Sequence, residues 1–445
     1  MRLLGRLRSS GAARGIWNLV DQVISSGNNF LIQIIVARSV SADDFGAFAI
    51  SFAIFSVAIA MFRALSTSPL AIRFSGADDA EFRRGGSAAV GTTLLVSIGL
   101  GVVLVAVAFL FAGSIRSCLM ALGLIIPGLL TQDAWRQTLF ARLRPAAACL
   151  QDGIWAVLQL SAALLLAFAH VPSPAPFVLA WGGSALLAAC LGVLQVGFLP
   201  RMTATMSWLR EQFSLIKYML PEQVIAYGST HLTTVLVSAV IGMAAAGSLR
   251  GGALLTAPAT MVASGLVSFA IPELSRRRAT MTEKGWLAAA AALSVPLAVF
   301  GAAWGGLFLL LPDAFGATLL GESWEGTKTV LVPTIVGQVA ACLAVGPSTV
   351  MYSTERVKTT IQLHMWLAAA TAVLPATFAL VWGLPGAAWG LGAAFWLVMP
   401  WWVLQMRRAA RDEVDVQRSA QDTVVFPSPF APADAPTIQM PRINP

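Results

Sequence analysis

Apolar runs of about twenty residues recur from one end of this chain to the other, which is the length that an α-helix needs to cross the hydrocarbon core of a bilayer. Hydrophobic residues make up 57% of the 445 residues, and charged residues make up only 11%. A water-soluble domain carries about a quarter charged residues, so this chain lacks the polar surface that it would need in water. The sequence therefore predicts an all-α polytopic membrane protein.

We expect about twelve spans, because residues 15–405 divide into that many apolar segments of near-spanning length. The first residues, 1–14, are basic and predict a cytoplasmic N-terminal segment, whereas the polar, Pro-rich residues 406–445 predict a disordered cytoplasmic tail. The expected spans are 15–37, 45–69, 87–111, 117–132, 146–169, 175–199, 218–242, 249–272, 286–311, 328–351, 359–382 and 385–405.

The Lys and Arg residues lie mainly in the segments that would share one side of the membrane. In the loops of the other side the sequence has only Arg38, Arg116, Arg250 and Lys328, and Arg63 falls within a span. Cytoplasmic loops of membrane proteins are enriched in Lys and Arg. The bias therefore predicts a multi-pass protein of the cytoplasmic membrane with both termini in the cytoplasm.

This orientation also accounts for the formal net charge of +8, so no nucleic-acid partner is needed to explain it. Anionic membrane lipids are the partners that such basic inner loops favour. The four cysteines stand singly in or beside apolar segments, without the spacing of a metal site or a disulfide framework. We expect neither a metal nor a cofactor.

Short motifs repeat between the two halves of the chain. Asp21-Gln22-Val23-Ile24 in the first span matches Glu222-Gln223-Val224-Ile225 in the seventh. Pro127 and Pro333, in the fourth and tenth spans, are each followed five residues later by a glutamine. A duplicated unit of about six helices gives parallel halves that are related by an axis along the membrane normal. We expect an N-lobe over 15–210 and a C-lobe over 211–405.

The first span carries far more polar residues than a lipid-facing helix tolerates. At 100° per residue, its polar side chains fall within an arc of about 160°, and those of the seventh span fall on the equivalent arc. Such walls are expected to line a water-accessible cavity shared by the two lobes. Gln22 and Asn29 on this wall are candidate substrate contacts.

DQVISSGNNF, ADDFGAFAISF and RALSTSPLAIRFS resemble the first two spans of bacterial polysaccharide flippases, and AAAGSLRGGALLTAP and LLGESWEGTK resemble later segments of that family. The resemblance covers essentially residues 15–405. It implies a member of the multidrug/oligosaccharidyl-lipid/polysaccharide exporter superfamily, with two lobes and alternating access. Members of the family that are similar to this chain move polyprenyl-diphosphate-linked glycans to the outer leaflet, which also implies glycan polymerase machinery as a partner.

Charged residues in or near the spans are the remaining site candidates. An arginine at mid-span costs at least ~2.5 kcal/mol, so Arg63 is expected to hold the substrate diphosphate or to snorkel towards the cytoplasm. Asp21, at similar depth, either pairs with Arg63 or binds a coupling proton or cation. Glu222 either repeats that role or favours the N-terminal helix dipole. Arg250, at the outer mouth of the eighth span, is expected either to guide an anionic headgroup or to be an ordinary arginine of the membrane interface.

Two other functions compete with a flippase. A cation-coupled multidrug antiporter of the same superfamily would use Asp21 as its first-span acid, but cationic drugs favour an acidic cavity and few acids are available here. An integral-membrane glycosyltransferase or polymerase would use Asp43 and Asp44 in the first outer loop. Ser41 followed by Asp44 instead reads as a helix N-cap, and no long outer loop is present, so we do not expect an enzyme.

Overall fold

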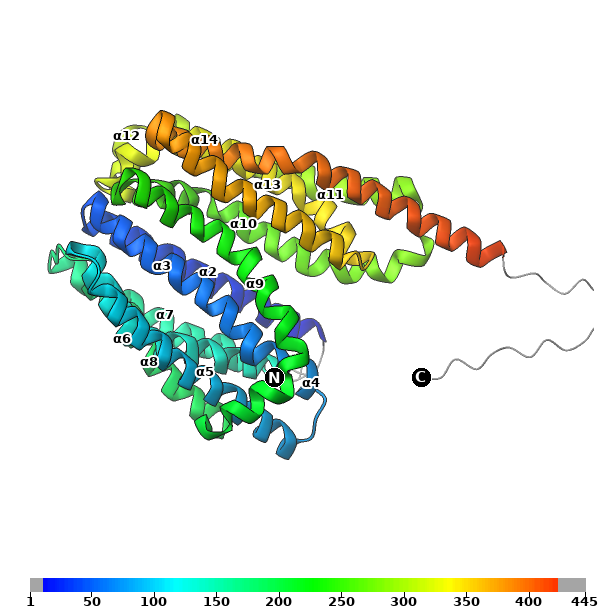
Figure 1. Cartoon of the computed structure of the whole chain (residues 1–445), viewed down its shortest axis with the longest axis horizontal. Helices are drawn as coiled ribbons and strands as arrows, with labels where there is room; N and C mark the ends of the chain where they lie inside the picture. The colour runs from blue at the N-terminus through cyan, green and yellow to red at the C-terminus, as the bar shows by residue number, and fades with distance from the viewer. Residues whose placement is uncertain (1–10, 423–445) are drawn as a thin grey trace, which may run out of the picture.

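The computed structural model describes residues 11–422, apart from the side chains of some residues within α2, α9, α10 and α14. The described residues form helices and no strands (Figure 1). The helices are α2 (Gly11–Ser39), α3 (Ala42–Phe62), the π-helical η1 (Arg63–Thr67), α4 (Ser68–Phe74), α5 (Asp79–Ala108), α6 (Gly113–Ala141), α7 (Pro145–Phe168), α8 (Ala175–Val196), α9 (Thr205–Ile241), α10 (Met243–Arg277), α11 (Glu283–Leu310), α12 (Asp313–Leu320), α13 (Ser323–Ser353) and α14 (Val357–Asp422), with short 3-10 turns η2 (Met202–Ala204) and η3 (Arg278–Thr280).

Among the described residues, eight helices are long and apolar enough to cross a membrane. They are α3 with its continuation through α4, then α5, α6, α7, α8, α11, α13 and α14. The prediction of an all-α polytopic membrane protein is therefore confirmed. The count of about twelve spans takes in α2, α9 and α10 as well and divides α14 into two helices that meet at Gly383, and it stays a prediction.

Two helices run further than the sequence indicated. The fourth span was expected to end at residue 132, but α6 continues to Ala141 and so brings Asp133 and Arg136 into the helix. The prediction of disorder after residue 405 is wrong for 406–422, which continue α14. There Met406 and Ala410 pack against neighbouring helices and Glu413 pairs with Arg278, so burial and an ion pair order this segment. Residues 423–445 lie outside the described residues.

The helices form two groups with α2 and α3 between them (Figure 1). One group consists of α5 to α8, and the other consists of α10, α11, α13 and α14. The expected boundary between the lobes at residues 210 and 211 falls inside α9, which begins beside the first group and ends beside the second. The division of the chain into parallel repeats stays a prediction.

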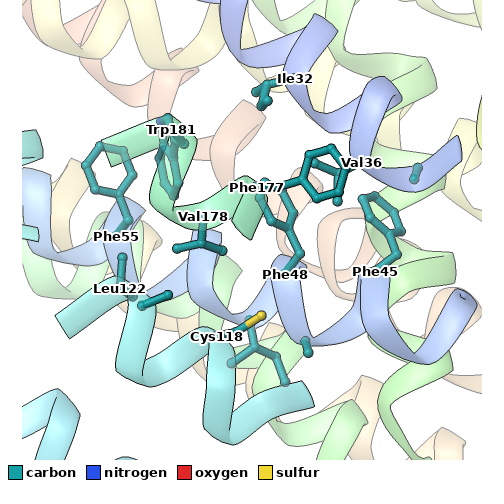
Figure 2. Close-up of a cluster of buried hydrophobic side chains, with 14 of the residues drawn as sticks. Ile32, Val36, Phe45, Phe48, Phe55, Cys118, Leu122, Phe177, Val178 and Trp181 are labelled. Atoms are coloured by element: carbon teal, nitrogen blue, oxygen red, sulfur yellow. The ribbon is translucent and has the colours of Figure 1, made fainter. Parts of the chain in front are cut away.

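The largest cluster of buried hydrophobic side chains lies where α3, α6 and α8 meet (Figure 2). Trp181 of α8 is fully buried, and its ring meets Phe55 of α3 edge to face at a centroid distance of 4.8 Å. Phe52 stacks on the same indole at 5.6 Å. Aromatic pairs at such distances stabilise a core beyond the burial of their area. This cluster fixes α3 on the α5–α8 group.

The two groups are packed tightly at one end, which the charge bias assigns to the outer side. Asp43 at the start of α3 accepts a hydrogen bond at 2.9 Å from the backbone N–H of Ala244 at the start of α10. A Cβ at Gly46 would overlap the carbonyl oxygen of Met243, so only glycine allows this approach. Ser41 caps α3 by accepting from the N–H of Asp44, as the sequence predicted. Asp43 and Asp44 thus hold the helix ends together.

Near its start, α9 is bonded to η1 and α4, which continue α3 and pack with it on the α5–α8 group. Pro69 has no N–H, so it leaves the carbonyl of Leu65 without its helical partner. The indole N–H of Trp208 in α9 donates to that carbonyl at 3.1 Å. Arg73 adds a hydrogen bond to the side chain of Gln212 at 2.9 Å. A proline in a membrane helix is tolerated where a neighbouring helix restores the lost bond in this way.

The C-terminal half of α9 is bonded to α14 in the same way, through a carbonyl that a proline leaves without its helical partner. Pro375 leaves the carbonyl of Thr371 free, and the hydroxyl of Thr233 in α9 donates to it at 2.6 Å. Val237, one turn further on, is buried in a cluster with residues of α10, α13 and α14. Pro221 lies inside α9 between these two attachments. One helix therefore connects both groups through carbonyls that proline has freed.

Candidate functional site

A cavity of about 490 Å³ lies between α2 and the wall formed by α10, α13 and α14. Phe52 of α3 closes it on one side. Its surface mixes amides and hydroxyls with apolar and aromatic side chains, and its volume is within the range of small-molecule sites, about 300–1,000 Å³. The polar uncharged residues that line it are Gln22, Ser26, Asn29 and Gln33 of α2, Thr256, Thr260 and Ser264 of α10, and Thr334 and Gln338 of α13.

Arg250 is the charged residue of this cavity; among the described residues that line it, no Asp, Glu or Lys accompanies it. It was expected at the outer mouth of its span, but α10 begins at Met243 and places it about two turns inside the helix. Its Nε donates to the side-chain oxygen of Gln33, and its guanidinium lies 4.2 Å above the ring centroid of Phe52. These contacts fix the orientation of a cation that faces the cavity.

The polar residues of α2 point to two different places. Gln22, Asn29 and Gln33 line the cavity, as the polar wall was expected to do. Asp21 and Asn28 are buried against the opposite side instead, and the amide of Asn28 donates to the side chain of Gln159 in α7 at 3.3 Å. The broad polar arc of this helix is therefore explained by two polar neighbours, the cavity and α7.

The seventh helix was expected to face the first across the cavity, and this stays a prediction, because the side chains of Glu222, Tyr227, Ser229 and Thr230 on its polar arc lie outside the described residues. Val224, Gly228 and His231 of α9 line a separate apolar hollow of about 1000 Å³ with α3 and α5. The wall opposite α2 comes from α10, α13 and α14. Glu222 belongs to α9, but its side chain lies outside the described residues, so its expected role stays a prediction.

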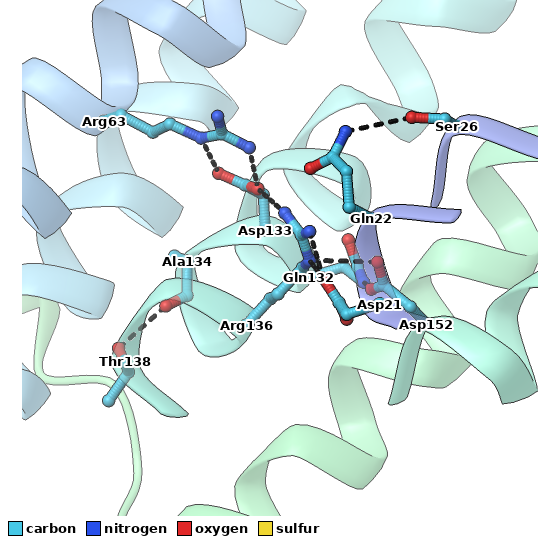
Figure 3. Close-up of polar contacts among 10 residues, drawn as sticks. All are labelled: Asp21, Gln22, Ser26, Arg63, Gln132, Asp133, Ala134, Arg136, Thr138 and Asp152. Carbon is cyan, nitrogen blue, oxygen red and sulfur yellow. Dashed lines mark hydrogen bonds and ion pairs between the residues drawn. The ribbon is translucent and has the colours of Figure 1, made fainter. Parts of the chain in front are cut away.

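A network of ion pairs lies on the side of α2 that faces away from the cavity, where α2 and η1 meet α6 and α7 (Figure 3). Arg136 of α6 is at its centre: its guanidinium pairs with Asp21 of α2, and its Nε lies 2.9 Å from a carboxylate oxygen of Asp152 in α7. It also lies 3.8 Å from Asp133, one turn earlier on α6. Arg63 holds Asp133 from the other side by two bonds of 2.8 and 2.6 Å.

These contacts correct the expected pairing of Asp21 with Arg63. The partner of Asp21 is Arg136, and the partner of Arg63 is Asp133. Both new partners became available because α6 continues to Ala141. Among the described residues, Arg63 does not line the polar cavity, so its predicted contact with a diphosphate has no support from its position.

The network is buried and carries an excess of negative charge. The side chains of Asp21 and Asp152 are each 1% exposed, and that of Arg136 is 11% exposed. When all are ionised, the carboxylates of Asp21, Asp133 and Asp152 outnumber the guanidinium groups of Arg63 and Arg136 by one. One carboxylate oxygen of Asp21 is buried without a hydrogen bond. Such a group can accept one proton or one monovalent cation.

Arg63 is held in a distorted stretch of its helix. The backbone of Arg63–Thr67 forms a π-turn, in which the N–H of Ser68 donates to the carbonyl of Arg63. π-Turns within α-helices occur frequently at functional sites. The sequence carries no reliable signal for the widened turn itself, although Pro69 two positions after Thr67 marks a helix that cannot keep regular hydrogen bonds.

Solved structures with the same fold are those of transporters. The lipid II flippase MurJ in an inward closed conformation matches with a TM-score of 0.66 at 11% identity, covering 94% of both chains. An inward-facing multidrug resistance MATE family transporter of the MOP superfamily matches with a TM-score of 0.66 at 14% identity, covering 93% of this chain and 100% of the other. An outward-facing MATE structure matches with a TM-score of 0.57 at 14% identity, covering 90% and 96%.

At these identities the likeness is one of fold. No curated protein matches the chain in sequence. A family model described as polysaccharide biosynthesis protein matches residues 35–329, which take in most of the network and the cavity's Arg250. That range is more than half of the chain, and it includes the segments of the second span and of the C-terminal half that resemble polysaccharide flippases. The chain therefore belongs to the polysaccharide biosynthesis protein family and has the fold of the MOP superfamily.

Proposed function

We propose that this protein is a flippase that moves a polyprenyl-diphosphate-linked oligosaccharide across the cytoplasmic membrane by alternating access, for the synthesis of a cell-surface polysaccharide. The proposal places the headgroup of the lipid in the cavity between α2, α10, α13 and α14. It places both termini in the cytoplasm, where the charge bias of the loops puts them. A glycan polymerase on the outer side is the class of enzyme that would consume the product.

The observation that carries the proposal is the chemistry of the cavity. Arg250 offers a planar guanidinium, which suits the bidentate binding of a phosphate. Gln22, Asn29 and Gln338 offer amide groups, which can both donate to and accept from sugar hydroxyls. Phe30, which also lines the cavity, adds an aromatic surface against a sugar ring. A positive group surrounded by neutral polar side chains suits an anionic glycan carrier.

The same chemistry disfavours the multidrug antiporter. A cavity for cationic drugs gains affinity from carboxylates, and among the described residues this cavity has none. The acidic residues of this region, Asp21, Asp133 and Asp152, are buried in ion pairs behind α2. They are therefore positioned to respond to an ion rather than to contact a drug in the cavity.

We assign the coupling role to Asp21 rather than to a cavity residue. Gln22 lines the cavity while the neighbouring Asp21 reaches into the network, so one turn of α2 touches both. A proton or a cation on Asp21 would weaken its attraction to Arg136 and release α2 from α6. Because Gln22 moves with that turn, occupancy of the network and the shape of the cavity would change together.

The tight packing at Gly46 and Asp43 supports a cavity that is closed at the outer end in this conformation. Alternating access then requires that the contacts of α3 with α10 break when the cavity opens outward. α9, which is bonded to both groups, would limit how far they can separate at the inner end.

The test is transport by the purified protein in proteoliposomes that carry a fluorescent polyprenyl-diphosphate-linked oligosaccharide. Arg250→Gln removes the cation of the cavity and leaves a side-chain amide that can still form hydrogen bonds, so we expect at least a tenfold slower translocation. Arg116→Gln is the matched control, because Arg116 stacks on Phe109 away from the cavity. The proposal fails if Arg250→Gln translocates the lipid normally, or if the wild-type protein moves cationic dyes and not the lipid-linked glycan.

A further inference from the structure

A second hollow, of about 340 Å³, lies in the α5–α8 group at the end of the molecule where the charge bias predicts the cytoplasm. Arg83 of α5 and Arg142 and Arg144 at the junction of α6 and α7 line it together. Its single acidic lining residue among the described residues is Asp79. The floor is apolar, made in part by Phe82 and Phe198, with the hydroxyl of Thr138 beside them.

Two of the three arginines, Arg142 and Arg144, are held in place by the protein around them. Arg142 pairs with Asp79, and its guanidinium lies 4.2 Å above the ring centroid of Phe82. Arg144 donates to the backbone carbonyl of Gln195 at the end of α8, at 2.9 Å. A guanidinium has five N–H donors, so each of these side chains keeps donors for a ligand. Little side-chain freedom remains to be lost when a ligand binds.

The positive-inside rule explains why arginines are found at this end, but it does not explain why three of them meet at one hollow. Arg84 is the useful comparison: it follows Arg83 on α5, is exposed, and does not line the hollow. The three guanidinium groups outnumber the carboxylate of Asp79 by two. The remaining charge has no acidic partner among the residues that line the hollow.

We propose that this hollow binds the phosphate group of an anionic lipid of the inner leaflet. Basic pockets between transmembrane helices on the cytoplasmic side are suited to anionic headgroups. The guanidinium groups would hold the phosphate oxygens, and the half-buried Val196 and Phe198 would contact the start of the acyl chains. Inorganic phosphate could also bind to the guanidinium groups, but it has no acyl chain to contact the apolar floor. The inference does not depend on which substrate the protein transports.

Binding to the purified full-length protein tests the inference. Delipidated protein in a neutral detergent is titrated with phosphatidylglycerol, with phosphatidylcholine and, separately, with inorganic phosphate. We expect phosphatidylglycerol to bind and the double variant Arg83→Gln/Arg144→Gln to weaken that binding by about tenfold or more, since each charge-assisted bond is worth that factor. The variant Arg84→Gln removes a neighbouring charge from the same helix and should bind as the wild type does.

The arms of the experiment separate the possible results. Weakened binding of both phosphatidylglycerol and inorganic phosphate supports the site and makes the phosphate group the main determinant. If only the binding of phosphatidylglycerol weakens, the site is supported, and contact of the acyl chains with the apolar floor is a second determinant of affinity. Equal loss in the double variant and in Arg84→Gln, or no preference of the wild type for phosphatidylglycerol over phosphatidylcholine, overturns the proposal.

The unliganded melting temperature of each variant controls for folding. If the glutamine variants do not fold, Arg83→Lys/Arg144→Lys replaces them. Lysine keeps the charge but not the planar fork, so binding should weaken by a few-fold and the headgroup preference should persist. Unchanged affinity in this lysine variant would then count against guanidinium recognition.

Discussion

Replacing Arg136 by glutamine should destabilise the protein more than any single change to its acidic partners. Arg136 donates hydrogen bonds to Asp21 and forms an ion pair with Asp152, and the side chains of both acids are 1% exposed. Removing it leaves Arg63 as the only arginine for three buried carboxylates. Removing one partner of a buried ion pair costs about 3–5 kcal/mol, because the other partner is left charged and unpaired.

Asp21→Asn removes the acidic partner of the Arg136–Asp21 pair, so it takes away a negative charge where Arg136→Gln takes away a positive one. It leaves Arg136 bonded to Asp152 and near Asp133, and it brings the formal charge of the network to zero. The asparagine can still accept a hydrogen bond, so we expect a smaller loss of about 1–2 kcal/mol. The double variant Arg136→Gln/Asp21→Asn should recover part of the loss of the arginine variant, since one of the unpaired carboxylates is gone.

Unfolding of the detergent-solubilised variants, followed by intrinsic tryptophan fluorescence against denaturant, measures these differences. Lys328→Gln is the control, because the Lys328–Asp313 pair is exposed on both sides and should contribute nothing measurable. Equal losses for Arg136→Gln and Asp21→Asn would refute the reasoning, as would a double variant that is less stable than Arg136→Gln. Either result would mean that the excess negative charge of the network is not what destabilises the arginine variant.

Three further predictions concern a close contact between helices, a hydrogen bond of α9 and the membrane topology. Gly46→Ala should separate the helix ends at Met243, visible as faster amide hydrogen exchange over 42–47, and unchanged exchange would show that the approach is not tight. Trp208→Phe removes the hydrogen bond between α9 and the Leu65 carbonyl of η1 and should cost about 1 kcal/mol or more in the same unfolding assay; a neutral result would mean that water replaces the indole. Cysteines placed at Arg201 and Ala317 should be labelled from opposite sides of the membrane, and labelling from one side would contradict the span assignment.

The all-helical membrane class could be read from the chain because hydrophobic length is a local property. The polar side of α2 could be read too, since helical periodicity fixes which residues share a face. The N-cap at Ser41 followed from adjacent residues alone. Each of these depends on a stretch of chain no longer than one helix.

The end of α6 was missed because Asp133 and Arg136 look like loop residues in a membrane protein. They remain helical because their charges are neutralised by residues on α2, η1 and α7, which are distant in sequence. The same holds for residues 406–422, where the partner of Glu413 is Arg278 near the end of α10. Charge in a helix is tolerated where a partner meets it, and composition does not reveal the partner.

Periodicity and composition thus established that the chain crosses a membrane, that α2 has a polar face, and that an arginine within a span needs a partner. Which arginine faces the cavity was settled by how the helices pack: Arg63 of η1 meets Asp133 of α6, whereas Arg250 reaches the cavity beside Gln33 and Phe52. A helical pattern gives the direction of a side chain about its own axis, but the residue that it meets depends on the neighbouring helix, its register and its length.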